Sequence, residues 1–239
     1  MPPEQLSMQY EGTQVPFQLI RRKNQRYINI RISHQGEVLV SAPHATSIGR
    51  IKEALHAKQA WITKHLGKVR GNLRQFDPLY AVPIHGEQYK IRVMEGRTAR
   101  DRINISAQDR TITIETSDKS RKHLIEVLRH RIPREARIYL RILSREFSGK
   151  TGIQFEKLFV RNQKTRWGSS SGRGNISLNW RVLLLPPDIQ RYLVIHELVH
   201  QRHMNHSPAF WKQVEGFYPD FKKSNRWLRE HSYLLAFLR

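Results

Sequence analysis

Apolar and polar positions alternate over the first part of the chain, as they do in β-strands. Every second residue of 28–32 is isoleucine, and two valines two positions apart follow after a turn at 34–36. This pattern predicts a β-hairpin within residues 17–42. Further short apolar runs predict the strands 89–93, 103–105 and 112–114.

Two other stretches carry apolar residues at the spacing of helix turns. Residues 47–66 have this spacing, which predicts a helix that ends at Gly67, and the basic stretch around Gly71 is typical of a loop. Residues 119–147 predict a longer helix, which Pro133 should break or kink because proline lacks the backbone donor and clashes with the preceding turn. One face of this helix after Pro133 is apolar, and the opposite face carries Arg134, Arg137, Arg141 and Arg145.

The second half of the chain predicts a hairpin and a buried helix. Strand-like runs at 155–161 and 175–184 flank the Gly-rich segment 167–174. This segment lacks the Gly-Lys-Ser/Thr ending of a phosphate-binding loop and leads into a strand, so we interpret it as a hairpin turn. Residues 189–204 then predict a helix, and nearly all of 192–200 is apolar, which is typical of a helix that is buried all round.

Together these elements predict an α+β fold. We expect a tail at residues 1–15 and a single domain over 16–239. This domain would have a β-rich amino-terminal part with one helix (16–118) and a catalytic part with helices and a β-hairpin (119–239). The 239 residues, of which 38% are hydrophobic, are sufficient for a buried core.

The composition excludes several kinds of chemistry. The chain has no cysteine, so disulfides, thiolate nucleophiles, iron–sulfur ligation and cysteine-bound zinc are absent, and a metal must be bound by His, Asp or Glu. No apolar run approaches the ~20 residues of a membrane helix, and the first ten residues hold no apolar signal stretch. We therefore expect a cytoplasmic protein without membrane contact.

Positive charge dominates the chain, with 42 Lys and Arg against 20 Asp and Glu and a net charge of +22. Such a surplus favours anionic partners such as nucleic acid, phosphates or acidic surfaces, without selecting among them. The four arginines after Pro133 have two interpretations: a solvated helix face, or a surface that binds nucleic acid or another polyanion. Only three acidic residues lie near them, too few to neutralise this face.

The motif that carries chemistry is His-Glu-Leu-Val-His at 196–200, within the predicted buried helix. Residues four apart share a helix face, so His196 and His200 can reach one ion from neighbouring turns. Glu197 lies about 100° round the helix from His196, where it can touch a water on the metal without binding the metal itself. Burial of these polar groups without partners would cost several kcal/mol, and a bound metal supplies the partner.

A catalytic zinc ion usually has three protein ligands and keeps a fourth position open. His206 precedes Ser207-Pro208, a pair typical of a helix N-cap and first helical residue, so the chain should turn there and bring His206 back to the motif. His203 shares a helix face with His196, but three ligands on one straight helix cannot easily surround a tetrahedral ion. We predict His206 as the third ligand, with Glu215 as the alternative.

These motifs resemble those of the YgjP-like family of predicted zinc metallopeptidases, which is related to the SprT-like proteases. The similar segments within 164–228 are Lys-Thr-Arg-Trp-Gly-Ser at 164–169, Ile-Ser-Leu-Asn-Trp at 176–180, Pro186, the 196–200 motif, Asn-His-Ser at 205–207, Phe210-Trp211 and Trp227-Leu228. The resemblance implies a mixed α+β, zincin-like fold, and one zinc ion held by His196, His200 and His206, with Glu197 as the catalytic residue. Family members often have Cys where this chain has Ser170, which argues against a thiol role there and leaves the zinc site intact.

The leading hypothesis is therefore a zinc metallopeptidase that acts on a peptide or protein. Glu197 would serve as general base and take the proton of a zinc-activated water. The strand near Arg166–Ser169 could pair with an extended substrate by edge addition. Residues that could support the ligands or face the substrate are His203, Arg166, Tyr218 and Asn205.

Two other functions use the same residues differently. A metal-dependent hydrolase of nucleotides or phosphoanhydrides would suit the positive charge, but such sites usually recruit Mg²⁺ through carboxylates, and the motif offers only Glu197. A basic nucleic-acid-binding module with a structural metal would also suit the charge. A structural zinc, however, needs four ligands and has no use for a base at Glu197.

Overall fold

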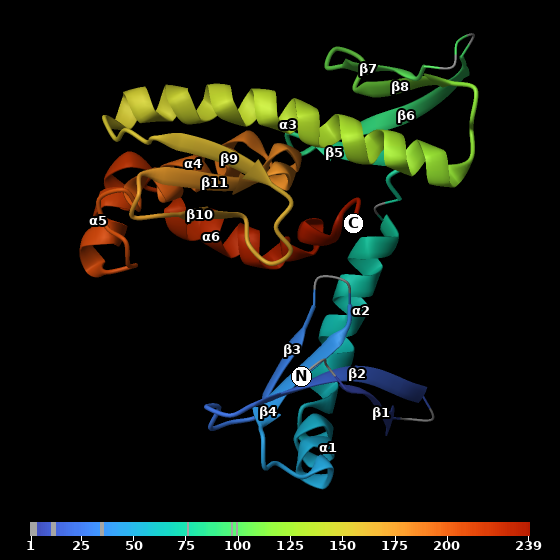
Figure 1. Ribbon diagram of the computed structural model, residues 1–239, viewed down its shortest axis with the longest axis vertical. Helices are drawn as coiled ribbons and strands as arrows, with labels where there is room; N and C mark the ends of the chain where they lie inside the picture. The colour runs from blue at the N-terminus through green and yellow to red at the C-terminus, as the bar shows by residue number, and fades with distance from the viewer. Residues whose placement is uncertain (1–3, 11–12, 34–35, 76, 97, 99) are drawn as a thin grey trace. The chain divides into compact units, whose positions relative to one another are not determined.

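Helices and small mixed sheets follow one another along the chain, which confirms the predicted α+β class (Figure 1). The computed structural model divides into residues 1–75 and 76–239, here called unit 1 and unit 2. The boundary between the units falls at 75/76 along the sequence rather than at 118/119. Strands after residue 80 belong to unit 2 because they share a core with the long helix that follows them. The structure describes residues 4–10, 13–33, 36–75, 77–96, 98 and 100–239.

Unit 1 contains a four-stranded sheet with the order β1-β2-β4-β3. Strands β3 (Asn29–Ile32) and β4 (Val38–Pro43) pair antiparallel, as the alternation predicts; His34 and Gln35 of the predicted turn lie outside the described residues. β2 (Thr13–Arg22) pairs in parallel with β4.

The predicted tail at 1–15 instead contributes to this sheet. Strand β1 (Glu4–Tyr10) lies within it and pairs antiparallel with β2. The physical reason is a short alternation in which Leu6 and Met8 face the apolar side of the sheet, where Met8 is buried.

Two helices complete unit 1. Ser47 caps α1 (Ile48–Ala57) by accepting a hydrogen bond from the backbone N–H of Arg50 at 3.3 Å. The single helix predicted for 47–66 is interrupted at Lys58, and α2 (Gln59–Gln75) then continues through Gly67 and Gly71. A glycine inside a helix costs only about 1 kcal/mol relative to alanine, so these two positions do not end it.

Unit 2 begins with a second sheet, of order β5-β6-β8-β7. Its strands β6 (Glu87–Glu95), β7 (Arg102–Ser106) and β8 (Thr111–Thr116) contain the three predicted strands. β5 (Ala81–Ile84) was not predicted, because all four of its residues are buried and therefore do not alternate.

The long helix α3 (Arg121–Thr151) follows and is continuous through Pro133, so the predicted break at this residue does not occur. Ser120 caps its start, and Gly152 ends it with φ +66°. Burial of its apolar face holds the helix together, since Leu128, Ile132 and Ala136 around the proline are all 0% exposed. In Figure 1, α3 extends from the second sheet to the third.

The third sheet has the order β10-β11-β9, from β9 (Lys157–Arg161), β10 (Gly168–Ser170) and β11 (Asn175–Asn179). The predicted hairpin of 155–161 with 175–184 is wrong, because β9 pairs with β11 in parallel. Residues 168–170 of the predicted turn are instead strand β10, which forms the hairpin with β11. The predicted strand 175–184 ends at Asn179, whose side chain accepts from the N–H of Arg181 and so caps the 3₁₀ helix η1 (Trp180–Leu184).

The chain ends in helical segments that pack with α3 around one core. Helix α4 is shorter than the predicted 189–204, because the chain turns after His200. None of the helices among the described residues is long and apolar enough to cross a membrane. The segments are α4 (Pro187–Val199), α5 (Pro208–Phe217), α6 (Phe221–Glu230) and η2 (Ser232–Ala236).

Candidate metal centre

Three histidines converge where α4 ends and α5 begins. His196 lies on the last turn of α4, and His200 is its C-cap. The chain then reverses, and Ser207 caps α5 by accepting from the N–H of Phe210, which returns His206 to the end of α4. One ring nitrogen of each histidine lies within 4.8 Å of the others, and the Nε2 atoms of His196 and His206 are 3.1 Å apart.

Hydrogen bonds fix the orientation of two of these rings. Nδ1 of His200 donates to the carbonyl oxygen of His203 at 2.9 Å, which leaves Nε2 free as a ligand. Nδ1 of His196 lies 3.4 Å from the hydroxyl of Tyr192, one helix turn earlier. The ring of Phe210 stacks on His200 with the centroids 4.4 Å apart.

The pKa values of two of these histidines favour the neutral form, which is the form that binds a metal ion. Burial, together with the neighbouring His200 and His206, lowers the pKa of His196 to about 3. Burial also lowers the pKa of His200. Neutral imidazoles present lone pairs, and a set of three nitrogen donors this close together fits zinc. The donor set is the observation on which the fit rests.

Glu197 is the only acidic group of the motif and is 4% exposed. Its Oε2 atom is buried and has no hydrogen-bond partner among the described residues. Burial raises the pKa of its carboxyl to about 8, and the positive charge of Arg166 opposes this rise. A carboxyl with a pKa in this range can both accept and release a proton near neutrality.

A cavity of about 270 Å³ opens onto these groups. Its lining consists of the three histidines, Glu197, Met204 and the three residues of β10. β10 is the edge strand of its sheet, and the side chain of Gln201 donates to the hydroxyl of Ser170. The cavity thus brings a ligand cluster and a buried carboxyl together with an edge strand.

Comparison with known proteins identifies the family. The profile described as YgjP-like, metallopeptidase domain, matches residues 26–231. The chain belongs to the YgjP-like metallopeptidase family. Membership makes this YgjP-like chain a peptidase-type hydrolase with a peptide or protein substrate.

A solved structure is also similar to this YgjP-like chain. It is the crystal structure of the metallopeptidase zymogen of Pyrococcus abyssi abylysin, with 28% sequence identity and a TM-score of 0.35. The match covers 38% of this chain and 93% of that chain. No protein with a curated description matches the chain.

The other predicted site residues of the YgjP-like chain lie around the cluster rather than in it. His203 contributes its carbonyl oxygen to His200, and Arg166 contributes its charge to Glu197. Tyr218 is the C-cap of α5, and its ring is 5.8 Å from that of Tyr192. Asn205 and Glu215 are exposed and do not belong to the histidine cluster. The four arginines Arg134, Arg137, Arg141 and Arg145 are exposed on α3.

Two residues of the YgjP-like site were missed from the sequence. Tyr192 precedes His196 by four positions, so the shared helix face was a signal that could have found it. Gly168 lies in β10 directly against Glu197, with no space for a side chain. The contact between Gly168 and Glu197 joins segments far apart in the sequence, and no local pattern predicts it.

Proposed function

We propose that this chain is a zinc-dependent peptidase in which His196, His200 and His206 hold the ion. The convergence of their ring nitrogens within 4.8 Å is the observation that carries the proposal. When bound, zinc supplies Lewis-acid chemistry: it lowers the pKa of water and polarises a carbonyl group. The family membership supplies the reaction class, hydrolysis of a peptide bond.

Glu197 is proposed as the general base. Its carboxyl lines the same cavity as the histidines, and no protein donor among the described residues occupies its Oε2. Glu197 takes the proton of the attacking water and passes it to the leaving nitrogen. General acid–base catalysis of this kind is most efficient when the pKa of the group lies near the working pH.

The substrate is proposed to bind as an extra strand along β10. This strand is at the edge of its sheet, so one row of its backbone groups is open to a peptide. Because Gly168 lies against Glu197, a peptide on β10 runs past the carboxyl and the histidines. Backbone hydrogen bonds from β10 thus orient the scissile bond of the peptide, and the residues of β10 line the cavity.

The proposal is tested by elemental analysis of the purified protein together with a cleavage assay. We expect about one zinc per chain, lost in His206→Ala and retained in Glu197→Gln. Glu197→Gln should lower cleavage of an unfolded protein substrate, followed by mass spectrometry, by roughly 10²- to 10⁴-fold. A well-folded wild type that takes up no zinc would refute the metal assignment. Zinc retained in His206→Ala but lost in His203→Ala would refute the choice of third ligand.

A further inference from the structure

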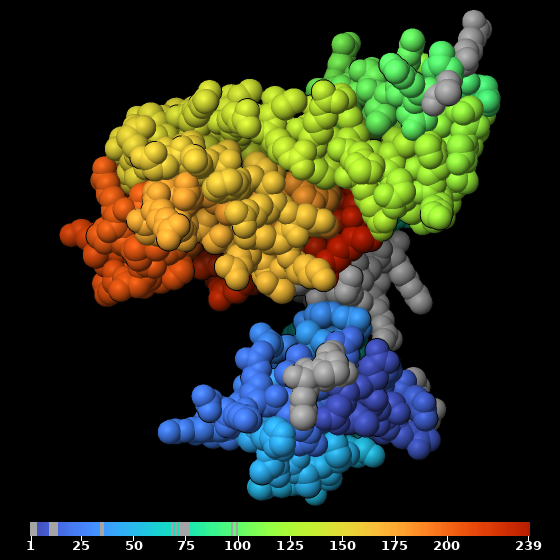
Figure 2. Space-filling view, viewed as in Figure 1, coloured from blue at the N-terminus to red at the C-terminus, as the bar shows by residue number. Residues whose placement is uncertain are grey.

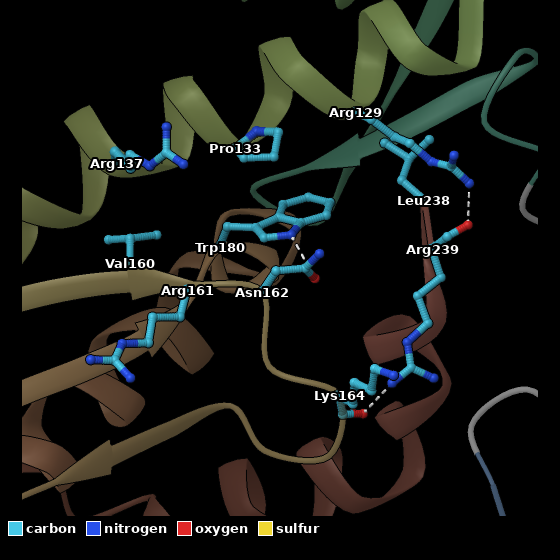
Figure 3. Close-up of a pocket in the computed structure, with 10 residues that line it drawn as sticks. All are labelled: Arg129, Pro133, Arg137, Val160, Arg161, Asn162, Lys164, Trp180, Leu238 and Arg239. Carbon is cyan, nitrogen blue, oxygen red and sulfur yellow. Dashed lines mark hydrogen bonds between the residues drawn. The ribbon is translucent and has the colours of Figure 1, made fainter.

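Unit 2 has a second cavity, of about 410 Å³, that shares no lining residue with the first. It lies between α3, the end of β9 with the segment that follows it, Trp180 of η1 and Leu238–Arg239 (Figure 3). In Figure 2 the C-terminal segment, in red, is visible between α3 and the gold region that contains β9. The proposed peptidase mechanism uses no residue of this cavity.

The lining of this cavity is strongly basic. Its cationic side chains are Arg129, Arg137, Arg161, Lys164 and Arg239, and no acidic side chain is among the described residues that line it. Arg129 pairs with Glu126 outside the cavity and donates to the main-chain oxygen of Arg239. Arg137, Arg161 and Lys164 have no ion pair within the described part of the chain, so their charge is uncompensated.

Hydrogen bonds hold the cavity lining in place. Asn162 accepts at Oδ1 from Trp180 Nε1 at 3.3 Å and from Arg181 Nη1 at 2.6 Å. Arg239 donates from Nη2 to the carbonyl oxygen of Lys164 at 3.1 Å. Since the side-chain oxygen of Asn162 is already occupied, its amide group and the cationic side chains are left as donors. A ligand of this cavity must therefore bring acceptors and negative charge.

A buried cation behind the lining strengthens this requirement. Arg181 is 0% exposed and donates to Asn162 and to the carbonyl oxygen of Phe237, but it has no carboxylate partner among the described residues, and its Nη2 has no hydrogen-bond partner there. Burial, together with the positive charge of Arg239, lowers the pKa of Arg181 to about 10. Burial of an unpaired charge is costly, and an anion in the adjacent cavity offsets that cost.

We propose that this cavity binds a compact, multiply charged phosphate anion, such as inorganic triphosphate or the triphosphate group of a nucleotide. The cationic side chains come from separate segments and line one cavity, whose volume is in the range of small-molecule sites. Guanidinium groups match the geometry of phosphate oxygens. A single-stranded nucleic acid is less favoured, because it needs exposed aromatic rings for stacking and Trp180, the aromatic residue of the lining, is 3% exposed.

Calorimetric titration of the zinc-loaded full chain tests the proposal. Inorganic triphosphate should bind, and Arg137→Gln should weaken binding on the order of tenfold. Arg145→Gln is the matched control, because Arg145 is equally exposed on α3, has no ion pair among the described residues and lies outside the cavity. This control should change affinity by less than about twofold. Lys164→Gln, on a different segment, should weaken binding as Arg137→Gln does.

Further titrations identify which part of the ligand is recognised and which site binds it. Equal affinity for ATP and inorganic triphosphate would assign recognition to the phosphates alone, whereas much tighter ATP binding would add a nucleoside contact. Both results support binding in the cavity.

Because triphosphate also chelates zinc, the titration is repeated in His206→Ala, where binding should persist. Loss of binding there would place the anion at the metal centre and overturn the proposal. Absence of binding at millimolar triphosphate, or equal weakening by Arg137→Gln and Arg145→Gln, would also overturn it. Oligonucleotide binding without triphosphate binding would assign the charge to an open surface instead.

Discussion

A methyl group on Gly168 would lie 2.4 Å from Oε1 of Glu197, because β10 lies directly against this carboxylate. The clash involves a side chain that is itself buried and cannot move into solvent. Glycine at position 168 therefore allows the edge strand and the proposed base to be neighbours. This relationship links the position of the substrate strand to that of the carboxyl.

Gly168→Ala should lower the rate of peptide cleavage on the order of 100-fold while zinc remains bound, because the atoms nearest to the added methyl group all belong to Glu197. Cleavage kinetics and elemental analysis check this expectation. Gly172→Ala in the same hairpin is the control, since a Cβ there meets nothing within 4 Å. Normal cleavage by Gly168→Ala would contradict the role assigned to Glu197.

Tyr192→Phe should weaken zinc binding about tenfold or more, because it removes the hydroxyl that orients Nδ1 of His196 while keeping the ring. Competition with a chromophoric chelator measures the affinity. Tyr89→Phe removes the hydroxyl of another buried tyrosine, in the second sheet, and should leave the affinity unchanged. Equal affinities for Tyr192→Phe and wild type would show that this contact does not orient the ligand.

Ser207→Ala should cost about 1 kcal/mol of stability and should also weaken zinc binding, because Ser207 caps α5 next to His206. Ser47→Ala removes an equivalent cap from α1 in unit 1 and should reduce stability there without any effect on zinc. Denaturant unfolding and zinc affinity are measured for both variants. If Ser207→Ala and Ser47→Ala have the same effect on zinc affinity, the turn before α5 does not position His206.

His85 makes the stability of unit 2 depend on pH. Burial lowers its pKa below the ordinary 6.5, although a hydrogen bond with Gln190 opposes this. The unfolded chain therefore takes up a proton on His85 at a pH where the folded chain does not. The stability that neutral His85 contributes is complete above pH 6.5 and is lost as the pH falls below that value. His85→Asn should flatten the decline in unfolding free energy between pH 7 and pH 5. Asparagine suits the position because His85 has φ +53°. Parallel curves for wild type and variant would exclude this contribution.

Local signals predict much of the fold and the meeting of the histidines. The alternation of β3 and β4, the spacing of His196 and His200, and the Ser207-Pro208 cap each depend on residues close together in the sequence. His206 approaches the motif because such a cap starts a new helix.

The features that the sequence did not predict depend on distant segments or on packing. The parallel pairing of β9 with β11 and the contact of Gly168 with Glu197 have no local pattern. The continuity of α3 through Pro133 is decided by the burial of its apolar face, which outweighs the local preference of proline. The basic cavity joins four segments, so the arginine pattern alone could indicate Arg137 but not its surroundings.

Pro133 lies in the lining of the second cavity, between Arg129 and Arg137. It has no N–H to donate to the carbonyl of Arg129, so α3 lacks one helical hydrogen bond at this level. The turn of α3 beside the cavity is therefore held less firmly than a turn that has all its hydrogen bonds. An anion that bridges Arg137 to Lys164 would brace this soft turn, and the bending of α3 would then depend on whether the cavity is filled.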